Sequence, residues 1–93
     1  MNEEEQKIMV TIKVPNPFEL LGWYGVIAIV LGYLLINLSV VTVLNPYYQF
    51  LNLTGAIGII ISSSKKKDYQ PLVINLIWAL IGIIAIARIV FKF

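Results

Sequence analysis

The side chains that could bind a solute are few, and they lie inside long apolar segments. Asn52, Asn75 and Trp78 are the most informative of them. An amide or an indole N–H inside a membrane needs a hydrogen-bond partner. Such groups either join packed helices or line a path for a small neutral solute, and both interpretations stay open here. Packing is the more common role for amides of this kind.

Several kinds of chemistry are excluded by composition. The 93 residues contain no His and no Cys, so an imidazole base, a thiol nucleophile, a disulfide or a Cys/His metal site cannot form. No nucleophile–base pair or phosphate-binding loop is recognisable. We therefore expect no enzyme, no metal and no cofactor. All acidic residues lie outside the apolar segments: Glu3, Glu4, Glu5, Glu19 and Asp68.

Charged residues are scarce and unevenly distributed. They make up 13% of the chain, hydrophobic residues make up 59%, and the mean hydropathy is +0.86. A soluble domain carries roughly 25% charged residues. No Asp, Glu, Lys or Arg occurs from Leu20 to Ser64 or from Leu72 to Ala87. We predict an all-α integral membrane protein with three transmembrane helices, at about residues 18–44, 46–63 and 71–91.

Each predicted helix begins at a proline. Asn16-Pro17 and Asn45-Pro46 place a capping side chain directly before a proline at the first helical position. Glu19 completes a capping box with Asn16. Gln70-Pro71 gives a weaker signal at the third helix, with Asp68 as an alternative cap. Because the connection between the first two helices is so short, we expect them to be antiparallel neighbours.

Residues 1–17 are predicted to form a separate N-terminal arm, and residues 18–93 the transmembrane domain. In the arm, apolar residues alternate from Ile8 to Val14, a period of two that is typical of an extended strand. A single strand is not stable alone, so a disordered arm is the alternative interpretation.

Small residues that would allow close helix packing recur along the three predicted helices: Gly25, Ala28, Gly32, Gly55, Gly58 and Gly82. Ala28 and Gly32 form a small-xxx-small step that lets another backbone approach. We assign Gly55 and Gly58 to two small-residue faces of the second helix, expected to be roughly opposite. We therefore expect this helix to pack on two sides.

The basic residues predict an orientation. With three crossings, Lys7, Lys13 and the cluster Lys65, Lys66 and Lys67 share one side, whereas Arg88 and Lys92 share the other. Five basic residues against two predict a cytoplasmic N-terminus and an outside C-terminus in the inner (plasma) membrane. The lysine cluster then determines topology, and it is too short to bind nucleic acid.

Three crossings enclose a path poorly, so a solute pathway requires at least two copies. We therefore predict a homodimer in the lipid bilayer, with six helices bundled around a central axis.

Short motifs resemble those of an uncharacterised bacterial three-helix membrane domain family that carries a locus-tag name of the CBU type. They are Gly22-Trp23-Tyr24-Gly25 with Tyr33, Tyr48-xxx-Asn52-xx-Gly55, and Asn75-xx-Trp78. The resemblance covers about residues 18–87. That family is distantly similar to the PQ-loop and SemiSWEET proteins, whose three-helix protomers dimerise and move small solutes such as sugars. The resemblance implies that Asn75 and Trp78 contact a solute. The chain departs from that pattern because it has no Pro-Gln pair inside a predicted helix.

Two functions stay open from the sequence. One is a dimeric facilitator of a small neutral solute, with Asn52, Asn75 and Trp78 as binding residues. The other is a non-transporting assembly or accessory module that packs with itself or with a larger membrane partner. Convergence of the three side chains on a cavity open to water would favour the facilitator.

Overall fold

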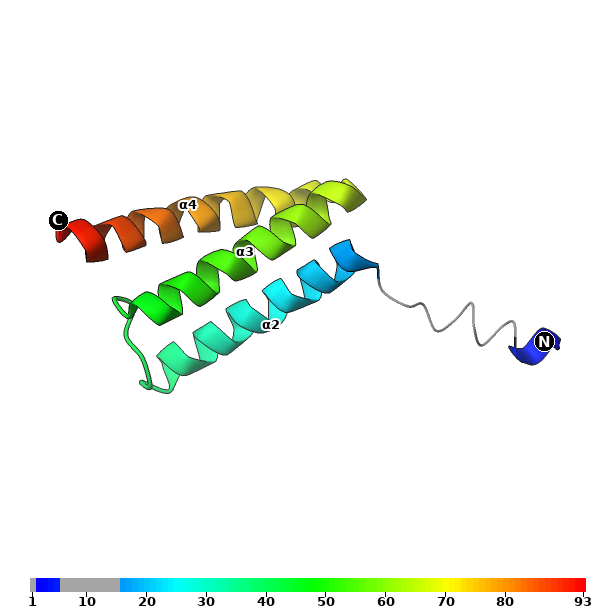
Figure 1. Cartoon of the computed structure of the whole chain (residues 1–93), viewed down its shortest axis with the longest axis horizontal. Coiled ribbons are helices and arrows are strands. Elements are labelled where there is room, and N and C mark those ends of the chain that lie inside the picture. Colours follow the sequence, from blue (N-terminus) through cyan, green and yellow to red (C-terminus); the bar gives the residue numbers. More distant parts are fainter. Residues whose placement is uncertain (1, 6–15) are drawn as a thin grey trace.

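Three long helices make up the fold (Figure 1). The computed structural model describes residues 2–5 and 16–93, and residues 3–5 form a single helical turn. Helix α2 is Pro17–Asn37, α3 is Pro46–Lys66 and α4 is Tyr69–Phe91. The predicted alternation at residues 8–14 lies outside the described residues.

The helices lie side by side, with α3 in the middle. Helix α3 packs against both α2 and α4, whereas α2 and α4, which are fully described, do not contact each other (Figure 1). Successive helices are antiparallel, so α2 and α4 begin at the end of the fold where α3 ends. The predicted three-helix bundle is therefore wrong, because the outer helices do not close around a common core.

Two helices of the described chain, rather than three, are long and apolar enough to cross a membrane. They are α2 and α4. Helix α3 contains Gln49, Asn52, Thr54 and Ser62–Ser64 and ends in lysines, which lowers its hydropathy. The prediction of three transmembrane helices is therefore wrong, and so is the six-helix dimer built on it. The predicted orientation loses its basis, because it assumed three crossings.

The first two helix starts follow the predicted caps. The Asn16 side chain accepts a hydrogen bond from the Glu19 backbone N–H at 2.8 Å. The Asn45 side chain accepts from the Tyr47 N–H at 2.9 Å and from the Tyr48 N–H at 3.3 Å. These bonds satisfy backbone donors that have no partner within the helix.

Three other boundaries differ from the prediction, and one of them is the end of α3, which lies at Lys66 instead of residue 63. Helix α2 ends at Asn37 instead of residue 44, and Ser39 follows with a left-handed φ of 60°. The residues after it stay apolar, so no change in hydropathy marks this end. Helix α4 begins at Tyr69, and its N-cap residue Asp68 makes no side-chain cap hydrogen bond.

Glycines bring α2 and α3 into close contact. A Cβ atom at Gly25 would collide with the carbonyl oxygen of Gly55, and one at Gly58 would lie 2.5 Å from the carbonyl oxygen of Leu21. Real Cβ atoms do not approach this closely. The absence of a side chain at these positions therefore sets the distance between the two helices.

The contact between α3 and α4 is less tight. Asn75, Ala79 and Gly82 are buried on α4, at a spacing of four and three residues that forms one helix face. A Cβ atom at Gly82 would lie 3.8 Å from the Leu53 side chain, which is an ordinary van der Waals distance. Close backbone approach is thus confined to the α2–α3 side of the fold.

Candidate functional site

A groove runs along α3 between the two outer helices. No Cα atom of α2 lies within 8 Å of one of α4, and Ile59, Ser62, Ser63 and Lys66 of α3 line a hollow between these two helices. Two hollows lie in this groove, and residues of both α2 and α4 line each of them. We call the groove the α3 groove. Its polar hollow lies where α2 and α4 begin, and its apolar hollow lies further along.

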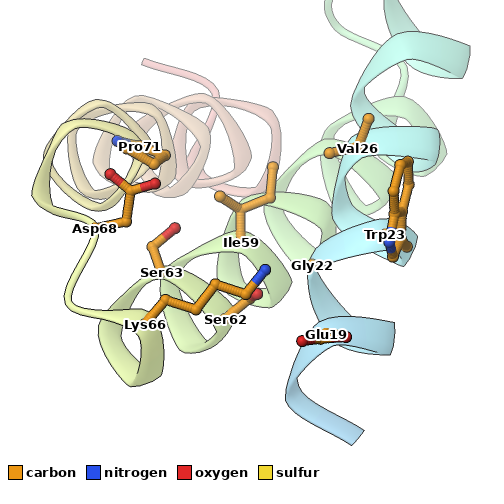
Figure 2. A pocket seen from close by; sticks show the side chains of 10 residues that line it. All are labelled: Glu19, Gly22, Trp23, Val26, Ile59, Ser62, Ser63, Lys66, Asp68 and Pro71. Carbon is orange, nitrogen blue, oxygen red and sulfur yellow. The ribbon is translucent and has the colours of Figure 1, made fainter. Parts of the chain in front are cut away.

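The polar hollow has a volume of about 250 Å³ and combines charged, polar and apolar walls (Figure 2). Trp23 and Val26 of α2 and Ile59 of α3 supply the apolar wall. Pro71 lines the hollow from the first turn of α4. All three helices thus line the hollow, and its walls include both charged and apolar side chains.

Two serines of α3 line this hollow. Ser62 is 6% exposed and Ser63 is 5% exposed, and neither hydroxyl has a hydrogen-bond partner among residues 2–5 and 16–93. Every fully buried side-chain polar atom of the described residues does have a partner. The two hydroxyls therefore keep access to the hollow, and Figure 2 shows the Ser63 oxygen directed into it.

Three charged residues surround the serines. Glu19 of α2 and Lys66 of α3 line the hollow together with Asp68 from the connection to α4 (Figure 2). Within the described part of the chain, no ion pair within 4.0 Å joins Lys66 to either carboxylate. Asp68 also makes no cap bond to α4. The hollow therefore holds two carboxylates and one ammonium that form no ion pairs with one another, so each can still bond a ligand.

The lysine cluster lies at the same end of the fold. The Lys65 Nζ atom lies over the Phe18 ring, 4.7 Å from its centroid, and this cation–π contact joins the end of α3 to the start of α2. Lys67 caps α3 in a left-handed conformation with φ of 56°. Lys66 alone among the three lines the polar hollow.

Two of the three predicted solute-binding residues come together, and the third does not. Asn75 and Trp78 line the apolar hollow of about 200 Å³ with Ile29 and Ile74. The Asn75 side chain donates to the Pro71 carbonyl oxygen of its own helix at 2.8 Å. One donor of its amide is therefore already used.

Asn52 lies apart from them. It is 9% exposed on α3 and lines neither hollow of the groove. The three residues on which a solute site would depend are therefore not convergent on one cavity of the described chain.

The small residues lie mostly between α2 and α3. Gly25, Ala28 and Gly32 are buried along one face of α2. Gly55 and Gly58 both approach α2, so the expectation that they lie on roughly opposite faces is wrong. The face toward α4 is built from other residues, and Gly82 contacts Leu53 there.

The sequence does not reveal the polar hollow, because its residues come from distant parts of the chain. In the sequence, Glu19 is recognisable only as part of a cap and Asp68 only as an alternative cap. Ser62 and Ser63 are the one local indication of the hollow, since two serines next to the lysine cluster make this end of the helix polar. The structure shows that Ser62 packs against Gly22 of α2, because a Cβ atom at Gly22 would lie 2.6 Å from the Ser62 hydroxyl oxygen. The sequence gives no sign of this contact.

The fold and the site together define a small all-helical protein with two apolar helices that could span a membrane. Among its described residues there is no cluster of side chains able to hold a metal ion. A family model matches residues 18–92, and the chain therefore belongs to that family, which is uncharacterised. The match includes α2, α3 and α4. No curated protein and no solved structure gives a significant match.

Proposed function

We propose that the chain is a membrane assembly module whose α3 groove receives a helix of another membrane-protein chain. The observation that carries this proposal is that α2 and α4 both pack on α3 without contacting each other. Helices in lipid associate through close van der Waals contact, which a groove between two helices provides on two sides. The composition excludes chemistry based on His or Cys. Among the remaining functions, association with another helix is the one that the helix packing supports best.

The walls of the groove support the same proposal. Ile74 is 56% exposed and Trp78 is 45% exposed, and both line the apolar hollow opposite Ile29. A helix lying in the groove would cover these side chains, and the Trp78 indole offers it a hydrogen-bond donor as well as a large contact area.

Movement of a small neutral solute is the second candidate, and Asn75 and Trp78 support it by lining one hollow. The separate position of Asn52 weighs against it. Uptake of labelled neutral solutes into proteoliposomes separates the two functions. Under the assembly proposal, uptake equals that of empty liposomes. Uptake that Asn75→Ala abolishes would support the facilitator instead.

Cysteine cross-linking tests the assembly proposal directly, because the chain contains no native Cys. We expect Ile29→Cys and Ile74→Cys to give cross-linked products with a bifunctional thiol–amine reagent in native membranes. Ile27→Cys is the matched control, since Ile27 is 62% exposed and lies about 200° around α2 from Ile29. The mass of the product distinguishes a second copy from a different protein. Products at the control position alone would contradict the proposal.

The proposal also requires the chain to be integral to a membrane. We expect it to stay in the membrane pellet after alkaline carbonate extraction and to be released by detergent. Recovery in the soluble fraction without detergent would contradict a membrane function of either kind.

A further inference from the structure

The polar hollow has the features of a binding site rather than of a packing defect. Ser62 and Ser63 are each more than nine-tenths buried, yet their hydroxyls have no partner among the described residues and face the hollow (Figure 2). Neither hydroxyl is a fully buried atom without a partner, so both stay accessible from the hollow. The two hydroxyls are therefore available to hydrogen-bond a polar group that enters the hollow.

The charges of the hollow select the kind of partner. Glu19 and Asp68 supply two carboxylates, and Lys66 supplies one ammonium. A ligand that pairs with all three needs both a cationic group and an anionic group, and the excess of carboxylate disfavours a purely anionic ligand. A primary ammonium suits the carboxylates best, since it donates three hydrogen bonds. A phosphate suits Lys66 and the serine hydroxyls.

The position of the hollow adds an apolar component to the ligand. It lies where α2 and α4, the two helices able to span a membrane, both begin. Trp23, Val26 and Ile59 form its apolar wall. At about 250 Å³, the hollow is smaller than the roughly 300–1,000 Å³ of a typical ligand pocket, so it suits a compact headgroup whose acyl chains lie against this wall.

We infer that the polar hollow binds the phosphoethanolamine headgroup of a zwitterionic phospholipid. The ammonium lies between the carboxylates of Glu19 and Asp68, and the phosphate accepts hydrogen bonds from Lys66 and from the hydroxyls of Ser62 and Ser63. The acyl chains lie against the apolar wall of Trp23, Val26 and Ile59 beside the hollow and leave the rest of the α3 groove free. This site does not depend on the assembly proposal, because it needs only residues of this chain.

Lipid retention in native mass spectrometry tests the inference. The full chain is purified in detergent, delipidated and incubated with equal amounts of phosphatidylethanolamine, phosphatidylcholine and phosphatidylglycerol. We expect phosphatidylethanolamine to be retained at least about fivefold more than the other two, because a trimethylammonium donates no hydrogen bond and phosphatidylglycerol offers no cation. Equal retention of the three lipids would overturn the inference.

Paired variants locate the site. Asp68→Asn and Ser63→Ala are expected to lower phosphatidylethanolamine retention about tenfold, the effect of one hydrogen bond to a charged group. Neither residue forms a hydrogen bond through its side chain within the described part of the chain, so both variants should keep the fold, as helical circular dichroism would show. Glu4→Gln and Ser64→Ala are the matched controls, since both residues are exposed and neither lines the hollow. Equal loss of retention in variants and controls would overturn the assignment.

A competition experiment distinguishes a lipid from a soluble molecule that carries the same headgroup. Glycerophosphoethanolamine at millimolar concentration should displace little of the bound lipid, because it lacks the acyl chains that contact Trp23 and the rest of the apolar wall. Displacement as complete as that by a diacyl lipid would overturn the lipid as the source and identify the soluble phosphoethanolamine compound as the ligand. Cross-linking of Ile29→Cys is unaffected by these outcomes, so failure of the lipid site and failure of the assembly proposal can be told apart.

Discussion

The hydroxyl oxygens of Tyr24 on α2 and Thr54 on α3 lie 2.7 Å apart and form a hydrogen bond between the two helices. Thr54 also donates to the Leu51 carbonyl oxygen at 3.1 Å, so its single hydroxyl proton is used there and Tyr24 is the donor to Thr54. At about 100° per residue, Tyr24 lies about 160° around α2 from Gly22 and Val26 of the polar hollow. The bond therefore holds the fold together on the face away from the α3 groove.

Removing this bond should weaken the α2–α3 contact without changing the groove. We expect Tyr24→Phe to lower the free energy of unfolding by about 0.6–1.7 kcal/mol, the range for hydrogen bonds between membrane helices. Titration with sodium dodecyl sulfate in mixed micelles, followed by circular dichroism, gives the measurement. In a double-mutant cycle with Thr54→Val, the two losses should not add; full additivity would show that the bond contributes nothing.

Adding a methyl group at the close contact should destabilise the fold. Gly25→Ala and Gly58→Ala each place a Cβ atom against a backbone carbonyl, so we expect the unfolding free energy to fall by about 1–3 kcal/mol. Gly82→Ala is the control, because its Cβ atom meets Leu53 at an ordinary distance of 3.8 Å. Alanine favours a helix interior, so this control should be neutral or slightly stabilising. An equal loss at Gly82 would contradict the difference between the two contacts.

The capping hydrogen bonds predict that removing the N-cap side chain destabilises α3 more than α4. Asn45→Ala removes an acceptor for two backbone N–H groups and should cost about 0.5–2 kcal/mol in unfolding free energy. Asp68→Ala removes no cap hydrogen bond, so its effect on unfolding should be much smaller. Both variants are compared with the unchanged chain in the same detergent titration. A loss at Asp68 as large as at Asn45 would mean that its carboxylate caps α4 after all.

Narrowing the polar hollow should lower lipid retention more than it lowers the free energy of unfolding. In Gly22→Ala the new Cβ atom lies 2.6 Å from the Ser62 hydroxyl oxygen, which must shift. We expect lower retention of phosphatidylethanolamine and a smaller loss of unfolding free energy than in Gly25→Ala, where backbone is in the way. Unchanged lipid retention in a folded Gly22→Ala protein would place the lipid elsewhere.

Local signals in the sequence were sufficient for the starts of α2 and α3 but not for the start of α4 or the end of α2. Asn16 and Asn45 cap their helices as predicted, because capping depends on neighbours in the chain. The end of α2 at Asn37 is set by a turn with Ser39 at positive φ, and the apolar residues beyond it gave no sign of that turn. Hydropathy reports burial in an apolar medium, and it cannot distinguish a helix from a turn of equal composition.

The count of membrane-crossing helices failed for a related reason. The stretch without charge from Leu20 to Ser64 hides the polar content of α3, because amides and hydroxyls add no charge. Because of residues such as Asn52 and Ser62–Ser64, α3 is less apolar than α2 and α4, which alone among the described helices are apolar enough to cross a membrane. The polar hollow was equally hidden, since Glu19 and Asp68 are brought to one site only by the packing of three helices.

The unequal tightness of the two helix contacts gives the fold one stiff wall and one compliant wall. Helix α2 is held against α3 by close backbone packing at Gly25 and Gly58 and by the Tyr24–Thr54 hydrogen bond, all of which would be lost if the two helices separated. Helix α4 meets α3 through ordinary side-chain contact and is joined to it only through Lys67 and Asp68. We therefore expect a molecule that widens the groove to move α4 about that connection while α2 stays in place. The conformational change on binding is then confined to the last helix.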